Sequence, residues 1–316
     1  MNEHPTHRGT RHIFTVDVEE YFHAHALGSS ISREDWDSLP SRVGAATRTM
    51  LDMLEGHGFE ATFFILGWVA ERHPEIVREI ARRGHEVASH GWSHRRIDNL
   101  SRREFRQELR DSKELLESLS GQRIVGFRAP SFSLVRGTEW ALTVLAEEGF
   151  VYDSSIYPIR RVGYGYPGAN TTPHLLQTGD EVLVEFPPAT LRTFGVNLPA
   201  GGGAYFRHLP FALTRTAFNQ MEQRRAPGVF YLHTWELDPD QPDVADGWLS
   251  RLRHYGHLER MPDRLDRLLD EFDFTSIRSE LSDVAAVTRS ESVTDGDESS
   301  GVRGSGQFDR VRARGD

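Results

Sequence analysis

The sequence predicts an α/β barrel, in which parallel strands alternate with crossover helices. Two observations carry this prediction. Short buried strand-like runs alternate with amphipathic helical runs over short connections, which is typical of a parallel sheet. The strand runs also end in polar residues, as expected where a barrel builds its site at the carboxyl ends of its strands. A length of 316 residues is long for one ordinary domain but normal for such a barrel.

The first half of the chain alternates strands and helices regularly. Strands are expected at residues 12–18, 60–66, 85–89 and 124–127. Helices are expected at residues 41–57, 68–73, 74–83 and 101–121, where apolar residues recur at helical spacing. Pro74 suits a first helical turn, Gly84 a helix end, and Ser101 with Glu104 forms a capping box.

The second half is less regular. Thr138 is expected to cap a helix that ends at Gly149, followed by a strand at 150–153 and an ordered loop at 157–173 that is rich in Gly, Pro and Tyr. Later elements are expected as strands at residues 182–186, 228–232 and 274–277 and a helix within 254–272. The run Gly201–Gly203 lacks the lysine of a phosphate loop, so we expect a close backbone approach to a substrate, or a plain turn, there.

Composition excludes several classes of protein. The chain has no cysteine, which removes disulfides and thiolate chemistry, and its formal charge of −10 argues against a nucleic-acid partner. This charge favours a neutral or cationic substrate. Without a long apolar run, the chain is expected to be cytoplasmic, with no membrane span and no signal peptide. Residues 1–11 are expected to be flexible and residues 282–316 to form a disordered tail.

Two histidines, His90 and His94, directly follow the strand at 85–89. At this spacing two neutral imidazoles can reach one divalent metal, and zinc, cobalt and nickel all suit such ligands. The alternative is a pair of solvent-facing histidines in a chain that has 15. Asp17 and Glu19 lie at the end of the first strand, where a barrel site would need them, with solvated loop acids as their alternative.

Four motifs occur in a fixed order. They are Thr15-Val-Asp17-Val-Glu19, Ser89-His90-Gly-Trp-Ser-His94, Arg128-Ala-Pro130 and Leu232-His233. In this order they resemble the polysaccharide deacetylase (NodB-homology) family over residues 13–236. The strings at residues 17–23, 152–158, 201–207 and 233–239 resemble the subgroup found with bacterial and archaeal exopolysaccharide gene clusters. That subgroup carries a C-terminal extension of unknown function, here about 237–281.

The resemblance implies a distorted (β/α) barrel of about seven parallel strands, and metal-dependent removal of acetyl groups from an N-acetylated glycan. Asp17 would be the base, His233 the acid that protonates the departing amine, and Arg128 the partner that holds Asp17 ionised. One divalent metal, zinc first and cobalt or nickel next, would bind Glu19, His90 and His94. The residues expected at the substrate are Trp92, Pro130, Asp153 and Tyr205.

The first motif departs from the family pattern of two adjacent aspartates, because Val18 occupies the second position. Valine cannot bind a metal. Glu19 is the nearest substitute through its longer side chain, and Glu20 is a weaker candidate because adjacent strand residues point to opposite faces. The departure leaves both the metal and the substrate open.

Two other functions remain open. A hydrolase of cyclic imides or ureides could use the same fold, and the aromatic residues Trp92, Phe132, Tyr205 and Trp235 would stack on flat heterocycles as well as on sugars. A non-catalytic carbohydrate-binding or assembly protein could also keep the barrel. The deacetylase is favoured because the candidate base, the candidate acid and the candidate metal ligands are all present in the sequence. Sugar identity, chain length and oligomeric state are not encoded in these motifs.

Overall fold

The computed structural model describes residues 9–24, 27, 31–161 and 163–282. Most of the N-terminal segment and of the tail expected at residues 1–11 and 282–316 therefore lies outside the described residues.

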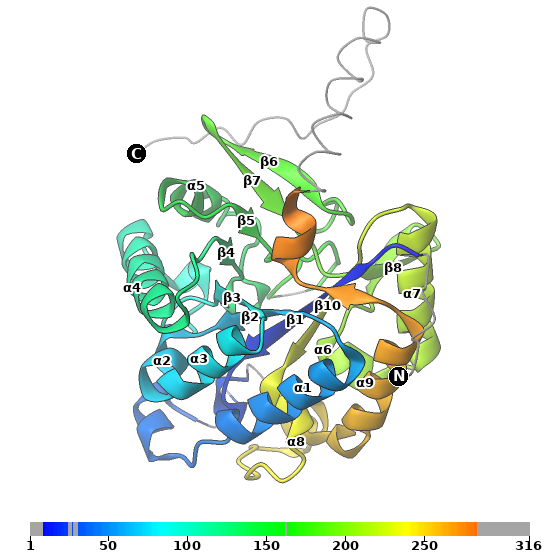
Figure 1. Ribbon diagram of the computed structural model, residues 1–316, viewed down its shortest axis with the longest axis horizontal. Helices are drawn as coiled ribbons and strands as arrows, with labels where there is room; N and C mark the ends of the chain where they lie inside the picture. Colours follow the sequence, from blue (N-terminus) through cyan, green and yellow to red (C-terminus); the bar gives the residue numbers. More distant parts are fainter. Residues whose placement is uncertain (1–8, 25–26, 28–30, 162, 283–316) are drawn as a thin grey trace, which may run out of the picture.

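One curled sheet organises the chain (Figure 1), with strand order β10-β1-β2-β3-β4-β5-β7-β6 and with β11 paired to β1. Its strands are β1 (His12–Val18), β2 (Thr62–Ile65), β3 (Glu86–Ser89), β4 (Gly126–Phe127), β5 (Tyr152–Asp153), β6 (His174–Thr178), β7 (Glu181–Glu185), β10 (Val229–His233) and β11 (Phe274–Thr275). The path from β10 to β7 is parallel at every pairing, which confirms the predicted barrel of about seven parallel strands. Among the described strands of this sheet, only β6 pairs antiparallel, with β7.

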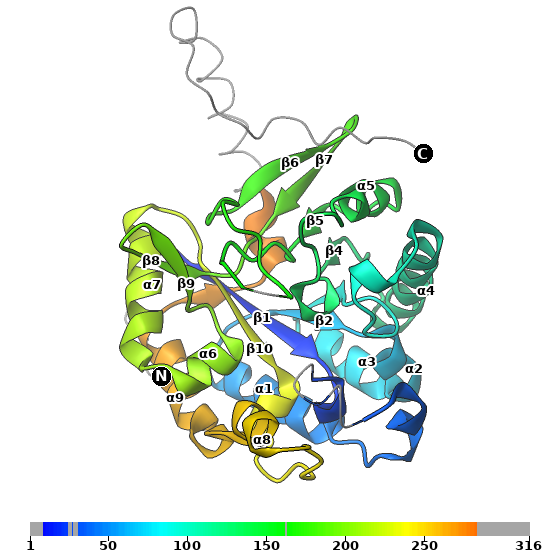
Figure 2. The ribbon, with the colours of Figure 1, turned by 180° about the vertical axis from the view of Figure 1, so that it is seen from behind.

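The ring between β7 and β10 closes through single bridges rather than a full ladder. Pro188 pairs with Val229, and Gly202 pairs with Tyr231. A separate hairpin of β8 (Thr190–Thr193) and β9 (Val196–Pro199) lies along this side of the barrel, beside α7, in Figure 2. This loose closure is the distortion of the barrel.

Helices surround the sheet (Figures 1 and 2). The α-helices are α1 (Val43–His57), α2 (Gly67–Arg72), α3 (Pro74–Arg82), α4 (Arg102–Ser120), α5 (Trp140–Glu147), α6 (Gly203–His208), α7 (Phe211–Gln223), α8 (Trp248–Tyr255) and α9 (Met261–Glu271). Short 3₁₀ turns are η1 (Tyr21–His23), η3 (Arg33–Ser38), η4 (Ile97–Asn99), η5 (Pro130–Phe132), η6 (Thr234–Leu237) and η7 (Leu258–Arg260). The capping box of Ser101 and Glu104 begins α4 as predicted.

The predicted cap of α5 is wrong. Glu139 occupies the N-cap position, and the hydroxyl of Thr138 accepts from the backbone N–H of Val135 in the preceding turn. Strands β6, β8 and β9 and helices α6, α7 and α8 were not predicted. The residues of β6 and β9 are mostly half-buried or exposed, so these strands carry no strong apolar alternation in the sequence.

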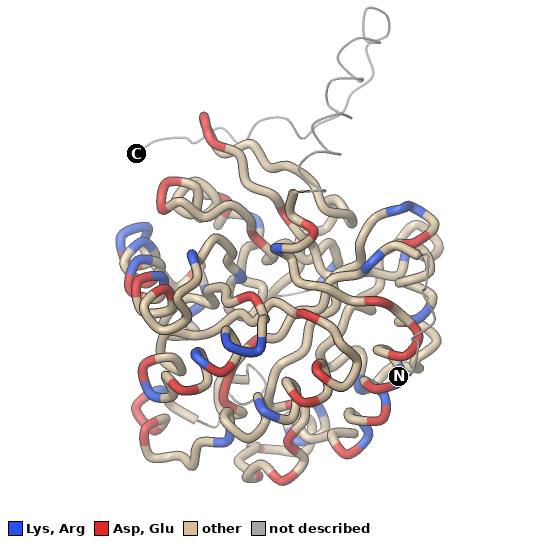
Figure 3. The backbone as a smooth tube through the Cα atoms, viewed as in Figure 1, with Lys and Arg blue, Asp and Glu red and all other residues tan. Residues whose placement is uncertain are grey.

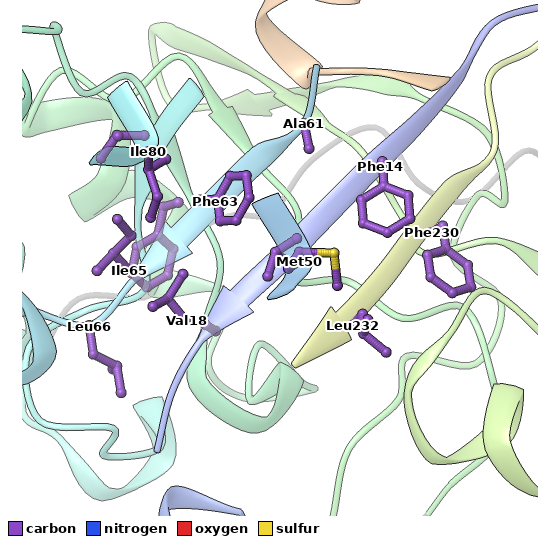
Figure 4. Packing of buried hydrophobic residues seen from close by; sticks show 14 of the residues in the cluster. Phe14, Val18, Met50, Ala61, Phe63, Ile65, Leu66, Ile80, Phe230 and Leu232 are labelled. Atoms are coloured by element: carbon purple, nitrogen blue, oxygen red, sulfur yellow. The ribbon is translucent and has the colours of Figure 1, made fainter. Parts of the chain in front are cut away.

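Alternation along β1 separates core from site. Phe14 and Val18 pack with Met50 of α1 and with Leu232 of β10 in the main core (Figure 4). Thr15 and Asp17 point to the opposite face, into the barrel, where both contact Arg128. Residues two apart on a strand share a face, so Asp17 and Glu19 can both reach the interior while Val18 fills the core.

Candidate functional site

A cavity of about 380 Å³ lies at the carboxyl ends of β1, β3 and β10. Figure 2 shows the ends of β1 and β10 directed towards the side of the barrel where α8 lies. The sequence-predicted residues that line the cavity are Asp17, Glu19, His90, His94, Phe132, Tyr205, His233 and Trp235. The parallel topology therefore brings together groups that are far apart in the chain.

Glu19, His90 and His94 form a compact buried cluster. Oε1 of Glu19 lies 2.8 Å from Nε2 of His90 and 3.0 Å from Nε2 of His94. The three donor atoms lie within 4.8 Å of one another, and all three residues are buried. Burial alone would raise the pKa of Glu19, but His94 and His90 hold it well below its usual range. The carboxylate is therefore ionised.

The backbone around His90 selects its tautomer. Nδ1 of His90 lies 2.8 Å from the carbonyl oxygen of Arg128, which can only accept a hydrogen bond. Nδ1 therefore carries a proton, and Nε2 is the ring nitrogen that faces Glu19 and the cavity. His94 reaches the cluster because the chain turns sharply, with positive φ at both Gly91 and His94.

Glu20 faces away from this cluster. Its carboxylate accepts hydrogen bonds from the hydroxyl of Ser41 and from the backbone N–H of Arg42, at the start of α1. The first N–H groups of a helix have no partner within the helix, and Glu20 accepts a hydrogen bond at this end of α1. Of the two acids considered in the sequence, Glu19 is the one that lies with the histidines.

The donor set of the cluster fits a divalent metal. Two imidazole nitrogens and one carboxylate, gathered on one side, leave further coordination positions towards the cavity. This is a ligand set of catalytic zinc sites, and the hydrogen bond from His90 to a backbone carbonyl is the support that such ligands have.

Asp17 is held by Arg128. Nη1 of Arg128 donates to Oδ1 of Asp17 at 2.8 Å and to the hydroxyl of Thr15 at 2.8 Å. The guanidinium is fully buried, donates to the carbonyl and hydroxyl of Ser154, and lies over the ring of Phe64. Oδ2 of Asp17 faces Nε2 of His233 across 3.9 Å. One carboxylate oxygen is therefore anchored and the other faces the cavity.

His233 is fixed by a partner that the sequence analysis did not assign. Its Nδ1 lies 2.8 Å from Oε1 of Glu236, whose Oε2 accepts from Nε of Arg207 at 2.7 Å. Burial alone would lower the pKa of His233, but Glu236, Glu19 and Asp17 together raise it to about 9. The imidazole is therefore protonated at neutral pH, with Nε2 directed at the cavity. The spacing His-x-x-Glu after a strand was the only signal for Glu236.

The structure places three of the predicted substrate residues outside the cavity lining. Trp92 packs over Gly67, and Pro130 is buried in η5. Asp153 is fully buried beside Glu185 on the neighbouring strand, where it accepts from the hydroxyl of Ser155. Through Ser155, whose hydroxyl receives the N–H of Ala129, Asp153 supports the segment that follows Arg128. Tyr205 does line the cavity.

The lining includes several residues that sequence reasoning did not single out. Among them are Arg161 and Tyr164 of the loop after β5, Arg207 and His208 of α6, and Arg253 and His254 of α8. Trp235 stacks between His233 and His254, with centroid distances of 5.2 and 4.3 Å. Helix α8 of the C-terminal extension is thus part of the wall.

The glycine run lies against β10. A Cβ on Gly202 would lie 1.8 Å from the carbonyl oxygen of Tyr231, and its φ is 136°. The run approaches the backbone of β10 closely, whereas the expected approach to a substrate stays a prediction. Glycine allows α6, which carries Tyr205 and Arg207, to start beside the site.

Two family profiles match the chain. Residues 35–148 match the family described as Polysaccharide deacetylase, and residues 154–282 match a domain of unknown function (DUF3473). The first contains His90, His94 and Arg128, and the second contains His233 and Glu236. The second begins well before residue 237, the predicted start of the extension. The two matched segments meet in one cavity.

Curated relatives align over part of the chain. A peptidoglycan-N-acetylglucosamine deacetylase of Bacillus cereus is 34% identical over 30% of this chain and 35% of its own length. A chitooligosaccharide deacetylase of Rhizobium leguminosarum bv. trifolii is 34% identical over 24% of this chain and 35% of its own length. The chain thus matches about a third of the length of these proteins.

A solved structure covers nearly the whole chain. The crystal structure of a protein described as a polysaccharide deacetylase from Mycobacterium smegmatis superimposes with a TM-score of 0.59 over 92% of this chain and 94% of that one. At 22% identity the similarity concerns the fold. Among the residues described here, no helix is long and apolar enough to cross a membrane.

Proposed function

Since this chain is built from a polysaccharide deacetylase domain and the DUF3473 region that follows it, we propose that it hydrolyses the acetamide of an N-acetylated glycan with a divalent metal. The observation that carries the proposal is the arrangement of three functions around one cavity. A metal-binding cluster, an anchored carboxylate and a protonated imidazole all line it.

Glu19, His90 and His94 would hold the metal, with zinc as the first choice. When bound, a divalent metal supplies a Lewis acid that polarises the acetamide carbonyl and acidifies a nearby water. Glu19 is ionised, and the tautomer of His90 presents Nε2 to the same point.

Asp17 is the proposed base. Its Oδ1 is engaged by Arg128, so Oδ2 is the oxygen that takes the proton of the attacking water. Burial of the ion pair fixes the direction of the carboxylate, because Arg128 is itself held by Ser154 and Phe64. Arg128 does not line the cavity and acts through Asp17.

His233 is the proposed acid. Its Nε2 carries a proton and lies across the cavity from Asp17, while Glu236 holds Nδ1. As the carbon–nitrogen bond breaks, the nitrogen of the departing amine takes this proton. The carbon keeps the oxygen of water and leaves as acetate. Base and acid are thus supplied by separate side chains.

The named activities of the relatives support an N-acetylated sugar as the substrate. Those proteins are deacetylases of peptidoglycan N-acetylglucosamine and of chitooligosaccharides. The test is acetate release from a panel of N-acetylated oligosaccharides by metal-loaded and by chelator-treated protein, with Asp17→Asn as the inactive control. Acetate release from the metal-loaded wild type alone would support the proposal. Glycan binding without acetate release by any form would show a carbohydrate-binding protein instead.

A further inference from the structure

Four arginines lie in the lining of the cavity. Arg96, Arg161, Arg207 and Arg253 line the cavity, whereas its only carboxylates among the described residues are Asp17 and Glu19. Both acids are buried and already engaged, by Arg128 and by the two histidines respectively. Neither cancels charge at the entrance.

Two of the four arginines are already engaged. Arg207 is buried on Glu236, and Arg96 forms two hydrogen bonds with Asp98. Arg161 and Arg253 are exposed, and neither lies within ion-pair distance of a carboxylate in the part of the chain described here. The side chain of Arg161 contacts Tyr164, but no described carboxylate pairs with either guanidinium, so both can bind the carboxylate of a ligand.

This local charge opposes that of the whole protein. The net charge is −10, and acidic and basic residues are mixed over the outer helices (Figure 3). Arginines there face carboxylates, as Arg83 faces Asp52 and Arg106 faces Glu148. At about 0.1 M salt, exposed charges more than about 10 Å away are largely screened, so the nearby arginines decide what the entrance attracts.

The wall beside Arg161 suits a sugar ring. The hydroxyl groups of Tyr164 and Tyr205 are hydrogen-bonded to each other, and both residues line the cavity. The guanidinium of Arg161 lies 5.9 Å from the centre of the Tyr164 ring. A sugar packed on these rings would bring a carboxylate on the same or the next ring to a guanidinium, which binds carboxylates with two parallel hydrogen bonds.

We propose that the cavity takes an acidic N-acetylated glycan, in which a carboxylate-bearing sugar adjoins the N-acetylated one and binds Arg161 and Arg253. The inference rests on the proposed function for its N-acetylated half. It differs from the expectation from net charge alone, which favoured a neutral or cationic substrate.

The test compares two tetrasaccharides, one of N-acetylglucosamine alone and one that alternates N-acetylglucosamine with glucuronate. Affinity is measured by calorimetry on the full-length, metal-loaded Asp17→Asn protein, and acetate release is measured on metal-loaded protein with Asp17 intact. Tighter binding of the acidic glycan is expected. In Arg161→Gln or Arg253→Gln, the ratio of acidic to neutral affinity should fall about threefold to tenfold, the worth of a partly exposed charged hydrogen bond.

The matched controls remove the same charge outside the cavity. Arg160 precedes Arg161 in the chain but lines a different cavity, so Arg160→Gln is the first control. The second is Arg251→Gln, which alters an arginine of α8 that pairs with Asp243. Neither control should change the ratio. Equal affinity for both glycans, or equal effects of test and control variants, overturns the inference. Preference for the acidic glycan without acetate release supports this inference and rejects the deacetylase proposal.

Discussion

Nδ1 of His233 donates a hydrogen bond to Oε1 of Glu236, three residues further along the chain, at 2.8 Å. Arg207 holds the other oxygen of Glu236 and donates to the backbone carbonyls of residues 253, 254 and 256, in and just after α8. The proposed acid is therefore tied to the C-terminal extension through one buried glutamate.

Glu236→Gln should shift the alkaline limb of the activity profile to lower pH. The pKa of His233 is raised to about 9, so the acid is protonated up to that pH, and removing the charge of Glu236 lowers this limit. Turnover at pH 8 should fall up to about 10²-fold, the lower end of the worth of a positioned acid. Glu259→Gln, at an exposed site, is the control. An unchanged alkaline limb in Glu236→Gln would separate Glu236 from the acid.

The same shift affects stability. Because the folded-state pKa of His233 lies above its ordinary value of 6.5, its contribution to stability is fully present below about pH 6.5 and is lost as pH rises through about 9. In Glu236→Gln the melting temperature should therefore depend less on pH between pH 6.5 and 9. If the melting temperatures of the two proteins changed with pH to the same extent across this range, Glu236 would not be the group that raises the pKa of His233.

Glu19→Gln should remove most bound metal, whereas Glu20→Gln should leave metal content nearly unchanged. Glu19 lies with both histidines, but Glu20 holds the start of α1, so its loss should lower stability by about 1 kcal/mol. Elemental analysis and urea unfolding separate the two effects. His90→Ala and His94→Ala should behave as Glu19→Gln does, and full metal occupancy in either would reject the site.

Asp17→Asn should reduce turnover on the order of 10²–10⁴-fold while retaining bound metal, because it removes a proton acceptor but no ligand. The amide also leaves the charge of Arg128 buried without a counter-ion, so the variant should melt at a lower temperature. Acetate release measures turnover, elemental analysis measures bound metal, and thermal unfolding measures the melting temperature. Retained turnover would place the base elsewhere.

His233→Ala should cost more with an amide than with an activated ester. An amine needs a proton to depart, whereas the alcohol of an aryl acetate leaves with little or none. The measurement is kcat for an N-acetylated oligosaccharide and for an aryl acetate. Equal losses on both would show that His233 binds or orients the substrate.

Gly202→Ala should destabilise the protein by about 3 kcal/mol or more, because the added Cβ meets the carbonyl of Tyr231 and φ is positive. Gly56→Ala, in α1 with open space around it, should be neutral or stabilising. Urea unfolding compares them. Equal stability of the two variants would show that the glycine run is an ordinary turn.

The first half of the barrel followed from local pattern. Strand β1 has the predicted limits, and α1, α3 and α4 end within about a residue of prediction, because helix ends and buried strands are encoded by neighbouring residues. The weakly patterned hairpins and the cap of α5 were missed or misassigned, since what they contact is not local.

By itself the sequence determined the barrel, the order of its motifs and the candidate roles of Asp17, His90, His94 and His233. The tertiary structure decided which groups meet. It placed Glu19 with the histidines and Glu20 against the start of α1, left Asp153 in the scaffold, and joined Glu236, Arg207 and α8 behind His233. The reason is physical: spacing along the chain fixes the face of a strand or helix, but contacts between distant residues depend on strand order and packing.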